Sequence, residues 1–493
     1  MKIRVNLIAL CLTMALPSTS TAQSYRVRLD TRAQSVWFRG LTADSILAAE
    51  VVTTPDGGFT TPDGRAVRCG AGLYCFFFRP GPELHAMPVS TTVSVTAWGL
   101  GTEGLSLRAS GRLIGDLGDD DVWPAAEPAA QLIEGLLEYR RGWVVARAGR
   151  QLIASRLEAI GFDGGWLKYG WNRVSLEVAG YAGWGLGQAA AVSPTNPALN
   201  PLDEFRPRDR QIVAGVEAGW SPGALDVRGE YRREIDPEDD YFVSERAALS
   251  LATRLRVIDV NAGLDYNIAE GHLGNADLRM SLLRKSYSVT AGARRYKPYF
   301  SLWTLWGAFS PVPYTAFNLS AETRLSKALS LHTRLERFQY SEAEVSTALV
   351  PHLEDQGWRF RLGGNATLGG RWTADGNFEL ETGPGASTQS GTVAVGYRMG
   401  ERLALDAFLG ALSRPLELRY YDAESRWIGM RAQFNQSDTR RVWADAALIS
   451  DERNRPDAGA SSLDQVRIRA GLTISLGNAA DRLPLPPARP TSR

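Results

Sequence analysis

Histidine is scarce in this chain, which limits the catalytic chemistry that its side chains could perform. The four histidines are His85, His272, His332 and His352. A hydrolase needs a base within reach of its nucleophile, and histidine is the commonest such base. Only His332 has charged neighbours in a regular pattern, because Arg334 and Glu336 follow it at intervals of two. This is the best catalytic candidate, but such a line of polar side chains more often belongs to a wet surface. We therefore predict that the protein is not an enzyme.

Two acidic runs could hold a hard cation, since calcium takes clustered carboxylate oxygens. The first run contains Asp116, Asp119, Asp120 and Asp121, and the second contains Asp236, Glu238, Asp239 and Asp240. Neither run has the spacing of an EF-hand loop, and charged runs between strands are usually just solvated. No Cys-x-x-Cys-His motif for haem attachment occurs. The sequence therefore predicts neither a metal site nor a cofactor, with calcium as the alternative at either run.

The cysteines indicate one disulfide. Cys11 lies in the N-terminal leader, so that only Cys69 and Cys75 remain in the mature chain. Two closely spaced cysteines in an exported chain most often form a structural disulfide. The alternative is a metal or thiol site, which would need histidine or carboxylate partners that do not cluster nearby.

Arginine recurs on the polar faces of the predicted strands. Its planar guanidinium pairs with carboxylates, and arginines that line a narrow aqueous passage concentrate anions there. Carboxylates such as Asp226 would pair with some of these arginines and weaken the field. The candidate pore-lining residues are Arg147, Arg228, Glu230, Arg232, Arg334, Glu336, Arg359, Arg361, Arg431, Arg467 and Arg469.

The candidate pore-lining side chains can face water only if the strands that carry them have one polar and one apolar face. The sequence predicts such strands, because apolar and polar residues alternate along it. In the stretch 466–476 every second residue is apolar, and the residues between are polar or small. A period of two places the two sets on opposite faces of one strand. The same alternation recurs along most of the chain, in runs near the roughly 9–11 residues that a tilted strand needs to cross a bilayer.

A soluble β-sandwich would give the same alternation, so other features must decide between the two folds. The polar faces carry several charges per strand, and aromatic residues gather near strand ends, as in the interfacial girdles of membrane barrels. Tryptophans at such positions are Trp143, Trp184, Trp220, Trp358, Trp372 and Trp427. We predict an all-β fold, a single large antiparallel transmembrane β-barrel of roughly 18–22 strands in the bacterial outer membrane.

The chain divides into a leader, a barrel and a tail. Residues 1–22 have a basic start, an apolar stretch and small residues before the cleavage point, which is the pattern of a secretory signal peptide. Residues 23–477 are predicted to form the barrel, with a disulfide-bearing insertion at about 41–88 that is either a structured loop or a partial plug. Residues 478–493 are rich in proline and arginine and are predicted to be a disordered tail.

The connections between strands alternate between tight and long, as turns and extracellular loops do in such barrels. The tight links include 221–223, 369–370 and 399–401, and the long links include 187–209 and 342–356. The stretch from Tyr296 to Phe317 is the most aromatic of the chain. We interpret it as two strand ends in the interfacial girdle. A loop folded into the lumen, or a docking surface, is the alternative.

The bulk composition excludes other classes of protein. The formal net charge of +1 argues against a nucleic-acid partner. No mature segment approaches the roughly 18 consecutive apolar residues of a transmembrane helix. A length of 493 residues would usually suggest several soluble domains. No stretch looks like a domain linker, so one large closed sheet is the simpler interpretation.

A short motif resembles a known family. Residues 147–151 read Arg-Ala-Gly-Arg-Gln, and residues 161–164 read Gly-Phe-Asp-Gly. This is similar to the "G-R-Q … F-D-G" pattern of porins of the alginate-export type. The resemblance implies a single-chain barrel that conducts an anionic polysaccharide through an arginine-lined lumen. One feature departs from it, because such barrels usually end on an aromatic residue, whereas the last strand here ends at Leu476 and Gly477 and a tail follows.

The leading functional hypothesis is an outer-membrane channel for the passive passage of polar solutes, including anionic ones. A second hypothesis is a sheath that houses a partner protein, such as a periplasmic multihaem cytochrome that carries electrons outward. A third is an enzyme embedded in the barrel, for which the line from His332 to Glu336 is the only candidate. The expected partners are outer-membrane lipid, the solute and, under the second hypothesis, that periplasmic protein.

Overall fold

The strands follow from the alternation of apolar and polar residues along the chain. In the computed structural model, the regular structure of the described residues is β-strand, apart from one 3-10 turn at Ala48–Glu50. The structure describes residues 24–483 except 54–58, 66, 71, 120–127, 187–210, 238–240, 298–312, 342–355, 384–385, 415–421 and 456–458. The predicted signal peptide lies outside the described residues. No helix in the described part of the chain is long and apolar enough to cross a membrane.

The sheet closes into a barrel because β1 (Ser24–Leu47) pairs with a strand on each side. It is antiparallel to β6 (Pro88–Trp98) through residues 24–33 and to β26 (Gly459–Leu476) through residues 27–36. From β6 to β26, each strand pairs with the next one along the chain. The described strands form a closed antiparallel barrel of 22 strands, which confirms the predicted fold.

The remaining barrel strands are β7 (Leu105–Asp116), β8 (Ala130–Arg141), β9 (Val144–Ser155), β10 (Glu158–Trp171), β11 (Leu176–Gly185), β12 (Ile212–Trp220), β13 (Leu225–Asp236), β14 (Tyr241–Leu255), β15 (Ile258–Asn267), β16 (His272–Leu283), β17 (Tyr287–Tyr296), β18 (Tyr314–Arg324), β19 (Leu329–Tyr340), β20 (Gln356–Leu368), β21 (Trp372–Gly383), β22 (Ala386–Met399), β23 (Leu403–Ser413), β24 (Asp422–Ser437) and β25 (Arg440–Arg455).

Tight turns and long connections lie at opposite ends of the barrel. The start of β1 and the end of β26 share one end, because Val27 pairs with Leu476. Since consecutive strands alternate in direction, the tight links 221–223, 369–370 and 399–401 also lie there, and we call it the turn end. Glycines in these turns have φ between 57° and 69°, a conformation that other residues rarely adopt. β11 and β19 end, and β12 and β20 begin, at the opposite end, the loop end, and the long links predicted between them lie largely outside the described residues. In outer-membrane barrels these ends are periplasmic and extracellular, respectively.

The outer face of the barrel carries exposed apolar side chains. Leu331 and Leu335 of β19 are 37% and 43% exposed, and their polar neighbours point to the other face. Exposed tryptophans mark both ends: Trp143, Trp220 and Trp372 at the turn end, and Trp184 and Trp358 at the loop end. These are the expected girdles. Trp427 is an exception, because it lies on the inner face. Its neighbour Ile428 points outward, and the Trp427 ring lies over Gly410 of β23.

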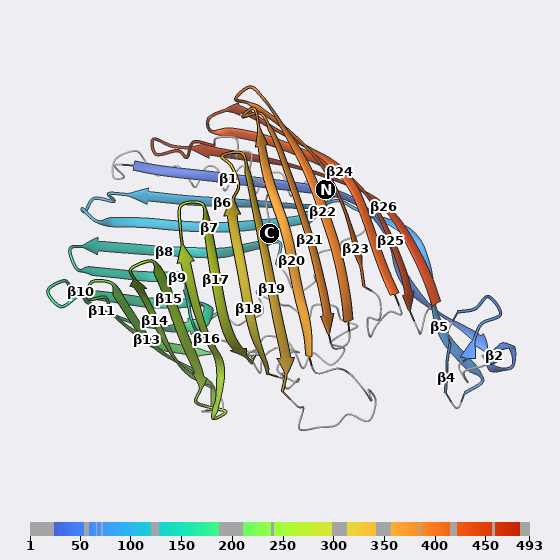
Figure 1. The fold of residues 1–493 in the computed structure, drawn as a ribbon, viewed down its shortest axis with the longest axis horizontal. Coiled ribbons are helices and arrows are strands. Elements are labelled where there is room, and N and C mark those ends of the chain that lie inside the picture. The colour runs from blue at the N-terminus through green and yellow to red at the C-terminus, as the bar shows by residue number, and fades with distance from the viewer. Residues whose placement is uncertain are drawn as a thin grey trace.

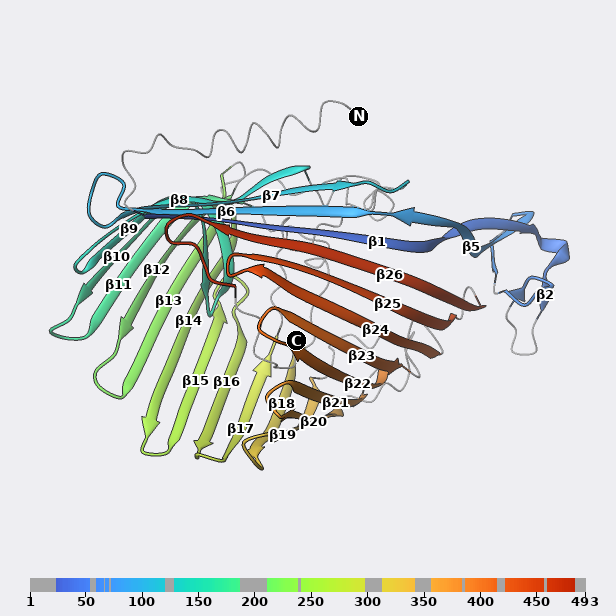
Figure 2. The ribbon, with the colours of Figure 1, turned by 90° about the horizontal axis from the view of Figure 1, so that it is seen from above.

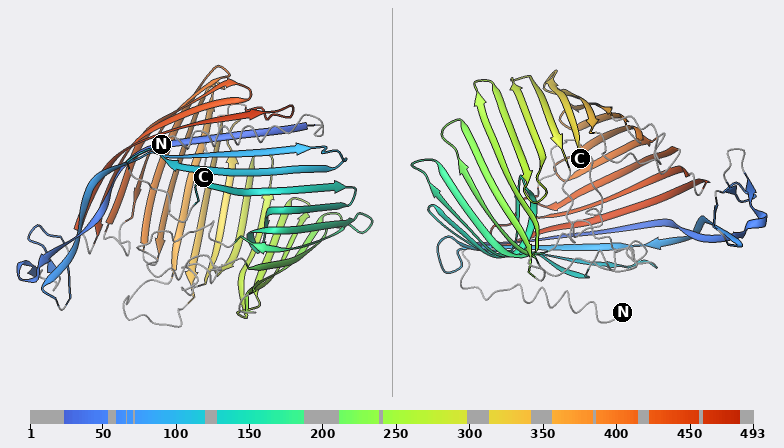
Figure 3. Two further views of the ribbon diagram at one scale, coloured as in Figure 1. Left: turned by 180° about the vertical axis from the view of Figure 1, so that it is seen from behind. Right: turned by 90° about the horizontal axis from the view of Figure 1, so that it is seen from below.

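Residues 37–47 of β1 leave the barrel and form a two-stranded ribbon with β5 (Tyr74–Ala86). The ribbon projects from the loop end, away from the barrel strands, in every view (Figures 1, 2 and 3). At ~3.3 Å per residue, it extends about 35 Å. The structure therefore contradicts the alternative in which the insertion at 41–88 is a partial plug. The described part of this insertion points away from the lumen (Figure 1).

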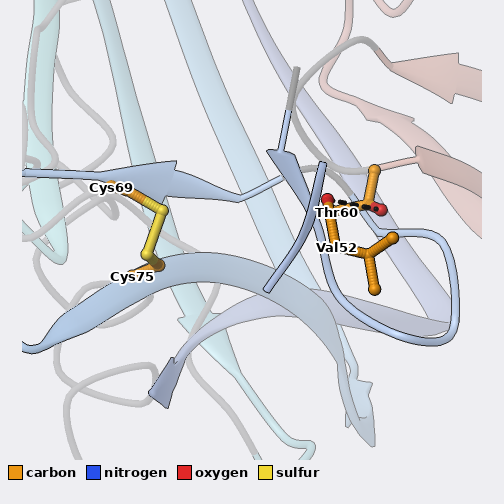
Figure 4. Close-up of a disulfide and its surroundings, with 4 residues drawn as sticks. All are labelled: Val52, Thr60, Cys69 and Cys75. Atoms are coloured by element: carbon orange, nitrogen blue, oxygen red, sulfur yellow. Dashed lines mark hydrogen bonds between the residues drawn. A yellow bond between two sulfur atoms is a disulfide. The ribbon is translucent and has the colours of Figure 1, made fainter. Parts of the chain in front are cut away.

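The tip of the ribbon carries three short strands, β2 (Val52–Thr53), β3 (Phe59–Thr60) and β4 (Arg68–Cys69). The Cys69–Cys75 disulfide joins directly opposite residues of β4 and β5, which confirms the predicted pair (Figure 4). Nearby, the Thr60 hydroxyl donates to the Val52 carbonyl at 3.4 Å (Figure 4). Hydrogen bonds from the Thr61 hydroxyl and then from Arg65 hold the pKa of Asp63 below its ordinary value. The tip thus has its own local hydrogen-bonded structure, although it stands apart from the barrel.

The segment after β26 folds back across the barrel seam, and we call residues 478–483 the C-terminal clasp. The amide nitrogen of Tyr25 donates to the Asn478 side chain at 2.8 Å, and Arg26 donates to Asp481 at 2.6 Å. The first strand is therefore tied to the end of the last one by side chains as well as by the β-ladder.

The clasp also reaches β24 and the turn that follows it. The Leu483 carbonyl accepts from Asn435 at 2.5 Å, and the Leu483 amide donates to the Asp438 carbonyl at 2.5 Å. Leu483 is only 5% exposed. The structure therefore corrects the predicted tail at its beginning, because residues 478–483 pack against the barrel. Residues 484–493 lie outside the described residues.

Candidate functional site

The inner face carries clusters in which several arginines share one carboxylate. The first cluster is centred on Glu336 of β19, which accepts from Arg294 of β17 at 2.9 Å, Arg334 at 2.7 Å and Arg359 of β20 at 2.8 Å. Glu336 and Arg359 are directly opposite in the β19–β20 register, which brings them together. Arg359 also donates to Glu381 of β21 at 3.0 Å.

Two further clusters have the same arrangement. Glu138 of β8 accepts from Arg147 at 2.7 Å and Arg140 at 3.2 Å, with Arg108 at 3.8 Å. Asp445 of β25 accepts from Arg469 of β26 at 2.8 Å and from Arg431 of β24 at 3.1 Å. Both of these arginines are directly opposite Asp445 in register. We refer to the groups around Glu138, Glu336 and Asp445 as the arginine clusters.

Burial separates the two kinds of charge in these clusters. The central carboxylates are almost fully buried, with side-chain exposures of 6% for Glu138, 2% for Glu336 and 0% for Asp445. The arginines around them remain between 26% and 61% exposed. A buried carboxylate is tolerated because several charge-assisted hydrogen bonds satisfy it. Each cluster holds more positive than negative charge, and the surplus lies on the exposed arginines.

The turn between β9 and β10 lies inside the barrel. Arg156 donates to Asp277 of β16 at 2.5 Å, and the Leu157 carbonyl accepts from Arg232 of β13 and from Arg246 of β14. Leu157 is 1% exposed. These contacts join residues that are 75 to 121 positions apart in the chain. Since β13–β16 are several strands away from β10, the turn must reach over the inner wall. We call residues 153–160 the inner hairpin.

The inner hairpin converts part of the wall into protein interior. Ile153, Ile160 and Phe162 form a buried apolar cluster with Tyr181 and Val213 of the next two strands. Next to this cluster, four charged side chains are at most 2% exposed: Arg232, Glu234, Arg246 and Asp265. Arg232 lies 3.4 Å from Glu234, and Arg246 lies 3.9 Å from Asp265. The charges in this region are balanced and shielded from the lumen, unlike those of the arginine clusters.

The motif that resembles alginate-export porins lies at the base of this hairpin. Arg150 and Asp163 are directly opposite in register and form a two-point ion pair, with both distances 2.8 Å. Gly149 has φ of 123°, and a Cβ there would collide with the Gly135 carbonyl. Gly164 and Gly183 also pack too closely for a side chain. These positions therefore require glycine, and the motif has a structural role in letting the strands approach each other closely.

The other predicted pore-lining residues fall outside the arginine clusters. Arg361 pairs singly with Glu379 at 2.6 Å, and Arg467 lies on β26 two residues before Arg469. Arg228 and Glu230 lie on the inner face of β13, where Glu230 is directly opposite Glu217. Arg232 is buried under the inner hairpin and does not line an aqueous passage.

Sequence reasoning missed Arg294, Glu138, Asp445 and the residues of the inner hairpin. Glu138 and Asp445 lie on alternating stretches, so the period of two would have placed them on the polar faces. The contact between Arg294 and Glu336 spans 42 residues and depends on the strand order, which the alternation alone does not reveal.

The structure gives His332 different partners from those expected. Its Nε2 lies 3.1 Å from the Asn377 side-chain oxygen, and Asn377 donates to Asp375 at 2.8 Å. Glu336 is held by arginines instead. Among the described residues, no group of three or more His, Cys, Asp or Glu side chains is arranged to hold a metal. Asp120, Asp121, Glu238, Asp239, Asp240 and His352 lie outside the described residues.

Comparisons with known proteins support the fold. No family model and no curated protein sequence matches the chain. Among solved structures, it is similar to the siderophore receptor PirA from Pseudomonas aeruginosa, with a TM-score of 0.50 and 13% identity over 93% of this chain and 81% of that chain. It is also similar to the ferric enterobactin receptor PfeA from the same organism (TM-score 0.49, 13% identity, 93% and 81% covered) and to OccAB2 from Acinetobacter baumannii (TM-score 0.39, 8% identity, 93% and 100% covered). At these identities the likeness concerns the fold alone.

A closed barrel with an apolar outer face, aromatic girdles and a charged inner face satisfies every backbone group without water, as a membrane-spanning sheet must. The chain therefore has the fold of a transmembrane β-barrel of the bacterial outer membrane. The finer resemblance to the alginate-export type rests on the short motif alone.

Proposed function

We propose that this protein is a channel for the passive passage of polar solutes across the outer membrane, and that it favours anions. The observation that carries this proposal is the burial pattern of the arginine clusters. Their carboxylates are buried and their arginines are exposed on the inner face. Solute would therefore meet positive charge, although the whole chain is nearly neutral. Low-dielectric walls strengthen such a field and raise the local concentration of anions.

The inner hairpin supports the same proposal. A barrel of 22 strands is wide enough to need a plug or an aqueous channel. The hairpin fills part of this width along β11–β16 and leaves the walls with arginine clusters on the other strands. Anions would thus pass along β17–β26, β1 and β6–β9, where the exposed arginines lie.

The test is conductance of the purified protein in planar lipid bilayers, with the reversal potential measured in a KCl gradient. We expect open channels with a chloride preference, and Arg334→Gln should shift the reversal potential toward cation selectivity. Arg254→Gln is the matched control, because it removes the same charge from a single pair with Asp259 (2.5 Å) and not from a cluster. A barrel that never conducts, or an equal shift in both variants, would contradict the proposal.

The sheath hypothesis remains as an outcome of the same purification. A barrel that does not conduct, and that copurifies with a red multihaem protein, would favour a sheath for an electron carrier. Neighbouring genes rich in Cys-x-x-Cys-His motifs would point in the same direction. An enzyme in the barrel would instead show an activity that is lost in His332→Ala.

A further inference from the structure

Three tyrosines form a row on the loop end of adjacent strands. Tyr296 of β17, Tyr314 of β18 and Tyr340 of β19 are directly opposite each other in the strand register. The ring centroids of Tyr296 and Tyr314 are 5.5 Å apart, and those of Tyr314 and Tyr340 are 5.6 Å apart. Neighbouring rings are tilted by 58° to 59° relative to each other, so that they are not stacked face to face. We call these residues the tyrosine row.

The tyrosine row belongs to the inner face of the barrel. The guanidinium of Arg294 lies 5.2 Å from the centre of the Tyr314 ring, and Arg294 binds Glu336. Phe317, three residues after Tyr314, points to the opposite face and is 63% exposed. The expectation that this aromatic stretch lies in the interfacial girdle is therefore wrong for Tyr296 and Tyr314, whereas Phe317 lies on the outer face. Residues 298–312 lie outside the described residues.

The arginine cluster around Glu336 lies next to the tyrosine row, one step further from the loop end along the same strands. Arg294 precedes Tyr296 by two residues, which places it about 6.6 Å deeper along β17. The buried Phe338 connects the two layers, since Arg359 lies 4.2 Å from its ring centre and Tyr340 packs against its edge. A solute entering from the loop end would meet aromatic rings first and exposed guanidinium groups next.

We propose that the tyrosine row and the arginine cluster below it form a binding subsite for carboxylates that carry an aromatic ring. The ring of such a ligand would pack against the tyrosines in the offset or edge-to-face geometry that aromatic pairs favour. Its carboxylate would take the N–H groups of Arg334 and Arg359 that Glu336 and Glu381 leave open. A small anion without a ring would use only the second layer, and a neutral ring only the first. The inference rests on the proposed channel function, because it assigns a solute class to the same lumen.

The test compares benzoate with acetate as blockers of chloride current in planar bilayers. Benzoate should half-block at a concentration about fivefold lower than acetate, from one added aromatic contact. The double variant Tyr296→Leu with Tyr340→Leu should remove this difference and leave the acetate block unchanged. Tyr287→Leu is the matched control, because Tyr287 lies on the same strand but is 43% exposed on the outer face. Arg334→Gln should weaken the block by both acids.

The outcomes separate this inference from the channel itself. Equal block by benzoate and acetate, or a benzoate preference that survives the double tyrosine variant, would overturn the subsite while leaving the channel intact. A protein that does not conduct would instead overturn the proposed function. In that case, saturation-transfer NMR of benzoate and acetate with the same variants in detergent micelles still decides the subsite. Migration of each variant as a folded barrel in unheated gels checks that the substitutions have not prevented folding.

Discussion

At the scale of single residues, the inner and outer faces of one strand impose opposite requirements. On β19, Leu331 and Leu335 are exposed on the outer face, whereas Arg334 and Glu336 belong to a cluster on the inner face. A charge on the outer face would lie in hydrocarbon, with a cost that depends on its depth. A change on the inner face alters only the charge and contacts of an aqueous surface.

We predict that Leu335→Arg costs about 2–4 kcal/mol of folding free energy and that Leu331→Arg costs less. Leu335 lies near the middle of β19, and Leu331 lies close to the turn end, where the cost in outer-membrane barrels falls toward zero. Arg334→Ser should leave folding nearly unchanged. Equilibrium unfolding in urea with lipid vesicles measures all three. Single cysteines along 329–336 should also alternate between aqueous labelling and quenching by a lipid-borne probe, and uniform aqueous labelling would contradict the assignment of faces.

At the scale of elements, the inner hairpin is held in place by a fit between glycine and arginine. The Arg156 guanidinium occupies the space where a Cβ on Gly263 of β15 would lie, and it pairs with Asp277 on the neighbouring strand. The hairpin therefore depends on the wall that it covers. Displacing it should widen the lumen without unfolding the barrel.

We predict that Gly263→Leu expels the hairpin turn and raises single-channel conductance. Asp277→Asn, which removes only the ion pair, should have a smaller effect on conductance and cost about 1 kcal/mol or less of stability. Gly376→Leu is a matched control on β21, where a new Cβ meets no atom within 4 Å. Conductance that stays at the wild-type level in Gly263→Leu would show that the hairpin does not restrict the passage.

The elements themselves could be read from the sequence, but their partners could not. The alternation in 466–476 and its counterparts identify strands, because burial on a pleated sheet has a period of two. The pairing of Asp445 with Arg431 and Arg469 requires the register of three strands, and a shift by one residue would turn each side chain to the other face. The inner hairpin was not predicted, because its contacts join residues 75 to 121 positions apart, and the alternation along the chain does not indicate such contacts.

At the scale of the whole molecule, closure of the barrel depends on β1. It is paired with β26 on one side and β6 on the other, and the C-terminal clasp holds its first residues. The last strand lacks the usual terminal aromatic residue, and the clasp supplies additional contacts at the same place. Its hydrogen bonds to Tyr25 and Arg26 lie at the seam between the first and the last strand of the barrel.

We predict that truncation after Gly477 destabilises the folded barrel, whereas truncation after Leu483 does not. The first truncation removes the clasp, and the second removes only residues beyond it. Several hydrogen bonds of about 1 kcal/mol each would be lost, for a total on the order of 3 kcal/mol. The temperature at which the barrel loses its compact form in gels measures this loss. Equal melting of the two truncated proteins would mean that the clasp does not stabilise the seam.

The long β1 strand also has a mechanical consequence. The same strand that closes the barrel continues into the ribbon and ends beside the disulfide-bearing tip. A force that pulls on the tip would run along β1 and, through β5, along β6, and it would load the hydrogen bonds of β1 with β26 and of β6 with β7 in shear. Bonds loaded in shear share the force and must break together, whereas bonds loaded at one end open one after another. The tip could thus bear tension from outside the cell without opening the barrel seam.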